Sequence, residues 1–247
     1  MSGYSKLHCE PFSENPMSLD DIAQRQRHHW KTLAAEHPGT VQAVGSESIA
    51  HKYLRYAKLA EIFSQRGPAE LSIHDVGCGV GDFYDWLKHS GHDLKQISYS
   101  ASEITPEYCE IARQRHPEVQ FYIRDILAKP VPDRYDYVIL SGVFHQQGDV
   151  SHRRWVDYMQ NLLSAAWGMT NVGMAFNVLT SYADFYKPGN FYADLSELQL
   201  FVVRHLSRFF RIDCSYPLFE ATFHVYKPSS IKYLYPQNEF QRYFLDV

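Results

Sequence analysis

Three glycines at alternate positions follow an apolar segment of this 247-residue chain. The segment is Leu71–Val76, and Gly77, Gly79 and Gly81 come next, before a sequence that can begin a helix at Asp82. Glycine allows positive φ and has no Cβ, so the backbone N–H groups of such a loop and of the following helix can approach a ligand closely. This spacing therefore predicts a site for a nucleotide-like cofactor.

The residues around these glycines distinguish between kinds of cofactor loop. A dinucleotide loop reads G-x-G-x-x-G/A and needs a small residue at its sixth position; counted from Gly77, that position is Asp82. No G-K-S/T follows, which excludes a phosphate-binding P-loop. The pattern is instead D-x-G-x-G-x-G, from Asp75 to Gly81. A Rossmann-type enzyme that uses NAD is therefore disfavoured.

From residue 71 onward, segments typical of strands alternate with segments typical of helices. Such β-α units imply a parallel sheet with helices on both faces and a ligand at the carboxyl ends of the strands. The last two strands follow each other closely, so they should pair as a hairpin, with one strand antiparallel. The predicted strands are Leu71–Val76, Gln96–Glu103, Val119–Arg124, Tyr135–Leu140, Val172–Leu179, Phe209–Tyr216 and Glu220–Tyr226. The predicted helices between them are Asp82–His89, one opened by Thr105-Pro106-Glu107, one from Ser151 to about Trp167, and Ser196–His205.

Two helices are predicted ahead of the sheet. Ser18 or Asp20 can cap a helix that runs to about Glu36, and a second helix covers residues 47–65. These helices are either packing elements or a lid over a pocket. Residues 1–66 are thus expected to form an arm and two helices within one domain, and residues 67–228 its core. Residues 229–247 form an aromatic tail that should pack back onto the domain.

Composition restricts the partners. The chain has 24 Lys and Arg against 28 Asp and Glu, a net charge of −4, which does not indicate a general nucleic-acid-binding surface. No apolar run approaches the roughly 20 residues that span a bilayer, and residues 1–8 lack the apolar core of a signal peptide, so we expect a cytoplasmic protein. The cysteines are widely separated, which favours reduced thiols and no metal site. They are Cys9, Cys78, Cys109 and Cys214.

Taken in order, these motifs resemble the class I S-adenosylmethionine-dependent methyltransferases. Asp75–Gly81 matches the first motif of that family, and Glu103 ends the second strand 22 residues past Gly81. Asp125 ends the third strand, and residues 136–142 resemble the fourth-strand motif. The resemblance covers about residues 70–227. It implies a Rossmann-like, seven-stranded, mostly parallel sheet of order 3-2-1-4-5-7-6 with an antiparallel last strand, S-adenosylmethionine as cofactor and S-adenosylhomocysteine as product.

The resemblance also assigns cofactor contacts. The loop glycines would let the backbone approach the methionyl part of the cofactor, and Asp75 would orient the loop or the ammonium group. As two-oxygen acceptors, Glu103 would bind the ribose hydroxyls and Asp125 the adenine amine. The alternative for both carboxylates is a strand-end or helix-cap role. The full predicted set is Asp75, Gly77, Cys78, Gly79, Gly81, Glu103, Ile104, Asp125, Ile126 and Ser141.

One histidine is a candidate for catalysis. Methyl transfer is an in-line displacement, in which a protein aligns the nucleophile, excludes water and sometimes removes a proton. His145 lies just past the fourth predicted strand, beside the expected position of the methyl group. An imidazole suits general-base work near neutral pH. His145 could equally serve as a hydrogen-bonding residue of its loop.

Aromatic residues are candidates for the acceptor pocket. Tyr182, Tyr186 and Tyr192 follow the fifth predicted strand, and Trp30 lies in the first helix. They could sandwich a flat acceptor or hold their segments against the core. The motifs of adenine, glutamine and arginine methyltransferases are absent from the sequence. We therefore expect O-, N- or C-methylation of a small molecule, such as a specialised metabolite, by a monomer or homodimer; the alternative is a cofactor-binding protein without transfer activity, used in regulation or assembly.

Overall fold

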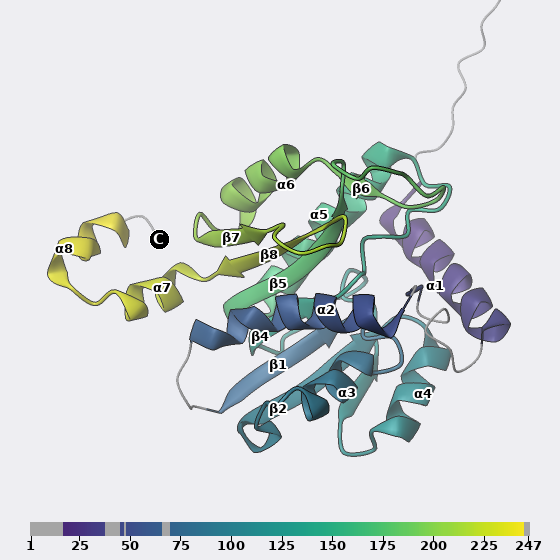
Figure 1. Ribbon diagram of the computed structural model, residues 1–247, viewed down its shortest axis with the longest axis horizontal. Helices are drawn as coiled ribbons and strands as arrows, with labels where there is room; N and C mark the ends of the chain where they lie inside the picture. The colour runs from purple at the N-terminus through teal and green to yellow at the C-terminus, as the bar shows by residue number, and fades with distance from the viewer. Residues whose placement is uncertain (1–16, 38–44, 47, 66–69, 245–247) are drawn as a thin grey trace, which may run out of the picture.

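A mixed β-sheet runs through the computed structural model, which describes residues 17–37, 45–46, 48–65 and 70–244 (Figure 1). Its order is β3-β2-β1-β4-β5-β8-β7, with β6 paired to β5. Strand β8 is antiparallel to both of its neighbours, and the remaining pairs are parallel. The predicted order and the antiparallel last strand are confirmed; β6 is an addition. The strands are β1 (Leu71–Val76), β2 (Ile97–Glu103), β3 (Gln120–Ile123), β4 (Tyr135–Leu140), β5 (Thr170–Thr180), β6 (Tyr192–Ala193), β7 (Phe210–Asp213) and β8 (Glu220–Tyr226).

Helices cover both faces of this sheet, as predicted (Figure 1). Side chains of α2, α3 and α4 share one hydrophobic core with the sheet, and side chains of α1, α5 and α6 share another. The helices are α1 (Leu19–Glu36), α2 (Ile49–Ala60), α3 (Asp82–His89), α4 (Pro106–Arg115), α5 (His152–Gly168), α6 (Leu195–Phe201), α7 (Pro228–Leu234) and α8 (Asn238–Gln241). Short 3-10 segments cover Glu61–Gln65, Leu94–Gln96 and Arg242–Phe244, and a π-helical turn covers Val202–Leu206.

Strand β4 shows why the sheet needs both layers. Val138 and Leu140 face one core, and Tyr137 and Ile139 face the other; all four side chains are buried. A parallel strand buried on both faces reads as a continuous apolar run instead of an alternating one. The carboxyl end of β4 therefore lies in the middle of the molecule, with helices above and below it.

Helix α5 anchors the loop that follows β4. Its buried residues Trp155, Tyr158, Met159 and Leu162 recur at the three- and four-residue spacing of one helix face. Trp155 is fully buried, and its Nε1 donates to the carbonyl oxygen of Phe144 at 3.1 Å. This hydrogen bond links the helix to the segment that carries the predicted catalytic histidine.

Both N-terminal helices begin at serine caps. Ser18 and Asp21 form a capping box, in which Asp21 N donates to Ser18 Oγ at 3.1 Å and Ser18 N donates to Asp21 Oδ2 at 2.8 Å. The predicted cap at Ser18 and the end at Glu36 are confirmed. Ser48 caps α2, and the predicted second helix ends as 3-10 turns after Ala60. The part of the predicted arm before residue 17 lies outside the described residues.

Local side-chain bonds shift two predicted boundaries. Asp194 accepts from Ser196 N and Glu197 N, so α6 begins at Leu195, one residue earlier than predicted. Asp213 Oδ1 accepts from the backbone N and the Oγ of Ser215, a turn that ends β7 before the predicted Tyr216. Both changes come from aspartates that compete for backbone N–H groups.

The C-terminal tail departs from the prediction. Phe244 is buried, with its ring 5.5 Å from that of Phe209, so it does pack onto the domain. However, α7 and α8 bury none of their own residues, and Tyr233 is 80% exposed. The two helices project beyond the end of β8 (Figure 1). The aromatic content of the tail therefore predicts more packing than the structure shows.

Candidate functional site

A cavity of about 810 Å³ lies at the carboxyl ends of β1, β2 and β4, bordered by α1 and α2. This position is where a doubly wound sheet binds its ligand, and the volume is near the upper end of the range for ligand pockets, about 300–1,000 Å³. Twelve of the predicted residues line it. They are Trp30, Asp75, Gly77, Cys78, Gly79, Glu103, Ile104, Asp125, Ile126, Ser141, His145 and Tyr192.

Three predicted site residues do not line this cavity. Gly81 begins α3 at φ +83°, and a Cβ there would lie 2.9 Å from His116 Cδ2, so its small size serves packing. Tyr182 and Tyr186 are 69% and 59% exposed. Tyr186 donates its hydroxyl to the Ser181 carbonyl. These tyrosines follow β5 as predicted, but their side chains are directed to solvent.

The first loop glycine is required by its surroundings. Gly77 has φ +73°, and an added Cβ would lie 2.8 Å from Val143 Cγ2 in the loop after β4. Its N donates to the Ser102 carbonyl of β2 at 2.8 Å. The two loops therefore meet closely enough to exclude a side chain, and the backbone of the glycine loop forms part of the cavity wall.

Two buried carboxylates flank the glycine loop. Glu103 accepts from Gly79 N at 2.9 Å and from Thr105 N at 2.8 Å; burial raises its pKa, against the effect of these donors. Asp75 accepts from the Tyr99 hydroxyl at 2.8 Å with Oδ2, while its buried Oδ1 has no partner among the described residues. Burial raises the pKa of Asp75 to about 7. This end of the cavity thus favours a ligand with donors and positive charge.

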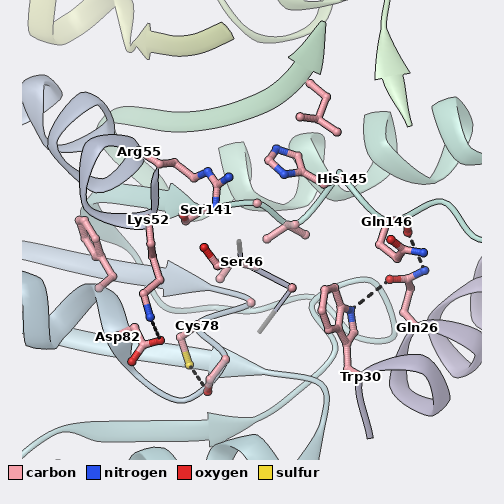
Figure 2. A pocket seen from close by; sticks show the side chains of 18 of the residues that line it. Gln26, Trp30, Ser46, Lys52, Arg55, Cys78, Asp82, Ser141, His145 and Gln146 are labelled. Atoms are coloured by element: carbon pink, nitrogen blue, oxygen red, sulfur yellow. Dashed lines mark hydrogen bonds and ion pairs between the residues drawn. The ribbon is translucent and has the colours of Figure 1, made fainter. Parts of the chain in front are cut away.

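Asp125 joins the cavity to helix α1. Its Oδ1 accepts from Leu127 N at 2.8 Å, and its Oδ2 pairs with Arg27 Nη2 at 3.3 Å. On the same helix, Gln26 Nε2 donates to the Gln146 carbonyl at 3.0 Å, and Gln26 Oε1 accepts from Trp30 Nε1 at 3.2 Å (Figure 2). Helix α1 therefore contacts the ends of both β3 and β4 and closes one side of the cavity.

An ion pair that the sequence analysis missed lies at the other end of the cavity. Arg55 of α2 binds Glu220 of β8 with two nitrogens, Nε to Oε2 at 2.9 Å and Nη2 to Oε1 at 2.5 Å. Burial would raise the pKa of Glu220, but the guanidinium outweighs it and the pKa is lowered. The pair is therefore charged, and its two members come from segments 165 residues apart.

Asn177 connects this pair to His145. Its Nδ2 donates to Glu220 Oε2 at 2.6 Å, and its Oδ1 accepts from Gly142 N at 2.8 Å, which together define the orientation of the amide. The same Nδ2 lies 3.1 Å from His145 Nε2, so that ring nitrogen must accept and the proton belongs on Nδ1. Burial lowers the pKa of His145 to about 4, helped by Arg55 and opposed by Glu220. The imidazole is neutral near pH 7.

Two of the residues that the sequence analysis missed, Asn177 and Glu220, show a weak signal in the sequence. Asn177 interrupts the apolar run of β5, and Glu220 is the first residue of a strand in which every residue is buried. The register sets Leu179 opposite Glu220. A buried polar residue in such a strand needs a partner. The sequence does not show that Arg55, on a helix before the sheet, is that partner.

Two properties of the described residues bear on whether the protein binds a membrane or a metal ion. No helix in these ranges is both long and apolar enough to cross a bilayer. Within them, His, Cys, Asp and Glu side chains form no group of three or more that could hold a metal ion. Cys78, Cys109 and Cys214 are free thiols, and Cys9 lies outside the described residues.

Comparison with other proteins identifies the domain. Residues 73–165 match a family described as "Methyltransferase domain". A Mycobacterium tuberculosis protein named "Putative methyltransferase Rv1506c" is 29% identical over 161 residues, which is 64% of this chain and 95% of that protein. The matched part includes the glycine loop and extends into helix α5.

Solved structures show the same fold. Magnesium protoporphyrin IX methyltransferase from Synechocystis PCC 6803, with bound S-adenosylmethionine, aligns with a TM-score of 0.59 at 14% identity and covers 84% of this chain and 97% of that one. The N-methyltransferase NodS from Bradyrhizobium japonicum WM9, in complex with S-adenosylhomocysteine, aligns with a TM-score of 0.58 at 12% identity. The alignment covers 81% of this chain and 98% of NodS. With its glycine loop between β1 and α3, its sheet order and its matched segment, the chain contains a methyltransferase domain and has the fold of the class I S-adenosylmethionine-dependent methyltransferases.

Proposed function

We propose that this protein transfers a methyl group from S-adenosylmethionine to an oxygen, nitrogen or carbon atom of a small organic molecule. The observation that carries this proposal is the continuity of the cavity. One cavity joins the glycine loop and Glu103 to the polar corner at Arg55 and His145. Donor and acceptor can therefore occupy adjoining parts of one enclosed space.

The residues at the glycine-loop end fit the cofactor. Asp75 has a buried oxygen without a partner among the described residues, suited to an ammonium donor. Each oxygen of Glu103 accepts one backbone N–H, which leaves each able to accept a ribose hydroxyl as well. Asp125 is available to the adenine amine if Arg27 gives up or shares its oxygen. When bound, the cofactor supplies an electrophilic methyl group on a sulfonium.

Apolar and aromatic side chains line the other end of the cavity, which suits a small organic acceptor. They include Phe185, Tyr192, Leu218 and Phe219. The two structural neighbours, a magnesium protoporphyrin IX methyltransferase and an N-methyltransferase, are consistent with this substrate class. The net charge of −4 argues against a nucleic-acid acceptor.

The residues of this chain would act by positioning and by excluding water. Helices α1 and α2 border the cavity and would act as the predicted lid. His145 would present its Nδ1–H to the acceptor, because Asn177 occupies Nε2. This network favours the hydrogen-bonding alternative for His145 over the general-base one. Alignment of the nucleophile then provides the main rate gain. We also propose a cytoplasmic location and a monomer or homodimer.

Calorimetry and turnover test this proposal. We expect the purified protein to bind S-adenosylhomocysteine and to transfer a labelled methyl group from S-adenosylmethionine to a member of a small-molecule panel, as seen by mass spectrometry. Binding without any transfer would support the alternative of a cofactor-binding regulatory or assembly protein. If the protein bound NADH and not S-adenosylhomocysteine, the proposal would fail.

A further inference from the structure

Two nitrogen donors face the same point of the cavity beside Gly142. Arg55 uses Nε and Nη2 to bind Glu220, and its Nη1 makes no hydrogen bond to any described residue. A Cβ built on Gly142 would lie 3.7 Å from Arg55 Nη1 and 3.9 Å from His145 Nδ1. Figure 2 shows the two side chains directed toward one another from opposite walls. The absent side chain of Gly142 leaves space between them.

Both groups at this corner donate, and neither accepts. A guanidinium has only N–H donors. The Asn177 amide occupies His145 Nε2, so the imidazole presents Nδ1–H to the cavity. The nearest carboxylate, Glu220, already accepts from Arg55 and Asn177. A ligand atom that satisfies the corner must therefore be an oxygen with free lone pairs.

The exposed charge at the corner is positive. Arg55 and Glu220 both line the cavity, but the side chain of Arg55 is 15% exposed and that of Glu220 is 4% exposed, so more of the cation than of the anion is accessible to a ligand. Lys52, another cation of the cavity lining, is paired with Asp82 at 2.6 Å. Hydrogen bonds to a guanidinium are strongest when the acceptor is itself ionised.

We propose that Arg55 Nη1 and His145 Nδ1 form a subsite for an anionic oxygen group on the methyl acceptor, a carboxylate or an ionised hydroxyl. The inference rests on the proposed function, because it names the class of acceptor. Glu220 and Asn177 are positioning residues in it: Glu220 holds the guanidinium plane, and Asn177 sets the imidazole tautomer. The aromatic wall beside this corner would receive the ring or apolar body of the acceptor.

Matched probes test the subsite directly. Protein saturated with S-adenosylhomocysteine is titrated at pH 7.5 with 2-naphthoate, 2-naphthamide and 2-naphthol, and with the acidic phenol 4-nitrophenol at a pH above and below its own pKa. We expect 2-naphthoate to bind at least tenfold more tightly than the uncharged 2-naphthamide. If the protein prefers ionised over neutral 4-nitrophenol but binds 2-naphthoate no better than 2-naphthamide, the anionic group that the subsite binds is an ionised hydroxyl and not a carboxylate.

Variants assign the preference to the corner. The double variant Arg55→Met/Glu220→Gln removes both charges, which avoids a buried unpaired ion, and should abolish the preference for the anion. His145→Gln keeps an N–H donor and should retain part of that preference, whereas His145→Leu should lose more of it. Arg211→Met is the matched control, since Arg211 also pairs with a glutamate, Glu61 at 2.6 Å, but lies outside the cavity.

The outcomes separate this inference from the proposed function. Three outcomes would each overturn the subsite: no preference for the anion in either pair of probes (naphthoate against amide, ionised against neutral 4-nitrophenol), no binding of any anionic probe at millimolar concentration, or an anion preference that survives in the double variant. In these cases, S-adenosylhomocysteine binding by the same protein leaves the proposed function standing. Failure of the wild-type protein to bind S-adenosylhomocysteine would instead count against the proposed function itself.

Discussion

Asn177 Nδ2 lies 3.1 Å from His145 Nε2, and the two remaining bonds of the amide, to Gly142 N and Glu220 Oε2, fix which end of Asn177 is the donor. A single buried asparagine thereby sets the tautomer of the histidine that faces the acceptor end of the cavity. Because burial also lowers the pKa of His145 to about 4, the ring stays neutral as well as oriented.

Replacing Asn177 should release this tautomer. In Asn177→Leu, Glu220 and Gly142 N each lose a partner, so we expect a loss of about 1–3 kcal/mol in the free energy of unfolding. The imidazole would then shift toward a mixture of Nδ1–H and Nε2–H forms. Nitrogen-15 chemical shifts of His145 measure the tautomer directly, and denaturant titration measures the stability. Unchanged shifts in the variant would contradict the assignment.

Cofactor binding should depend on pH through Asp75. The pKa of this carboxyl is raised from 3.8 to about 7 by burial, so between these values the folded protein holds a proton that the unfolded chain does not. By linkage, this group contributes stability below pH 4 that is lost as the pH rises through 7. Binding an ammonium group requires the ionised form, so affinity should increase toward pH 7 by up to about tenfold per pH unit and then level off.

Calorimetry with S-adenosylhomocysteine in two buffers of different ionisation enthalpy would show the proton released on binding below pH 7. Asp75→Asn should bind more weakly and without this proton release. Asp93→Asn, at an exposed 3-10 cap far from the cavity lining, is the control. A wild-type affinity that is flat from pH 5.5 to 8 would remove Asp75 from the ammonium site.

Glu103 should contribute both to cofactor affinity and to the stability of the glycine loop. In Glu103→Ala, ribose hydroxyls lose their acceptor and Gly79 N and Thr105 N lose theirs, so we expect binding weaker by about 1–3 kcal/mol. Glu103→Gln keeps one acceptor oxygen and should be intermediate. Glu110→Ala, which breaks only a surface pair with Arg113, should bind as the wild type does. Unchanged affinity in Glu103→Ala would rule out the ribose assignment.

Gly77 should tolerate alanine less well than Gly91 does. Both have positive φ, +73° and +83°, but a Cβ on Gly77 meets Val143 Cγ2 at 2.8 Å, whereas nothing lies within 4 Å of one on Gly91. Gly91→Ala therefore measures the backbone strain alone, about 1–2 kcal/mol, and Gly77→Ala should destabilise further. Val143→Ala should recover part of the difference in thermal or denaturant unfolding. Equal losses at both glycines would show that the contact is unimportant.

The succession of strands along the chain and the glycine loop were predictable because their signals are local, whereas the order of the strands in the sheet was implied by the family resemblance. Apolar runs bounded by turn residues mark β1 and β4, and the spacing of Gly77, Gly79 and Gly81 is read within seven residues. The predicted hairpin of β7 and β8 likewise depends on a short connection. Two boundaries shifted where an aspartate side chain, at Asp194 or Asp213, bonded its neighbours' backbone. Strands β3 and β5 also differ at both ends from their predicted bounds.

The acceptor end of the site was not predictable in the same way. Arg55, Asn177 and Glu220 lie on a helix before the sheet and on two later strands, and each residue alone has an ordinary structural explanation. Their meeting depends on the packing of α2 across β5 and β8. The local pattern therefore identified the methyl donor through its binding loop. The tertiary structure decided which charges face the cavity, because residues distant in sequence create a cavity wall only when sheet and helices pack together.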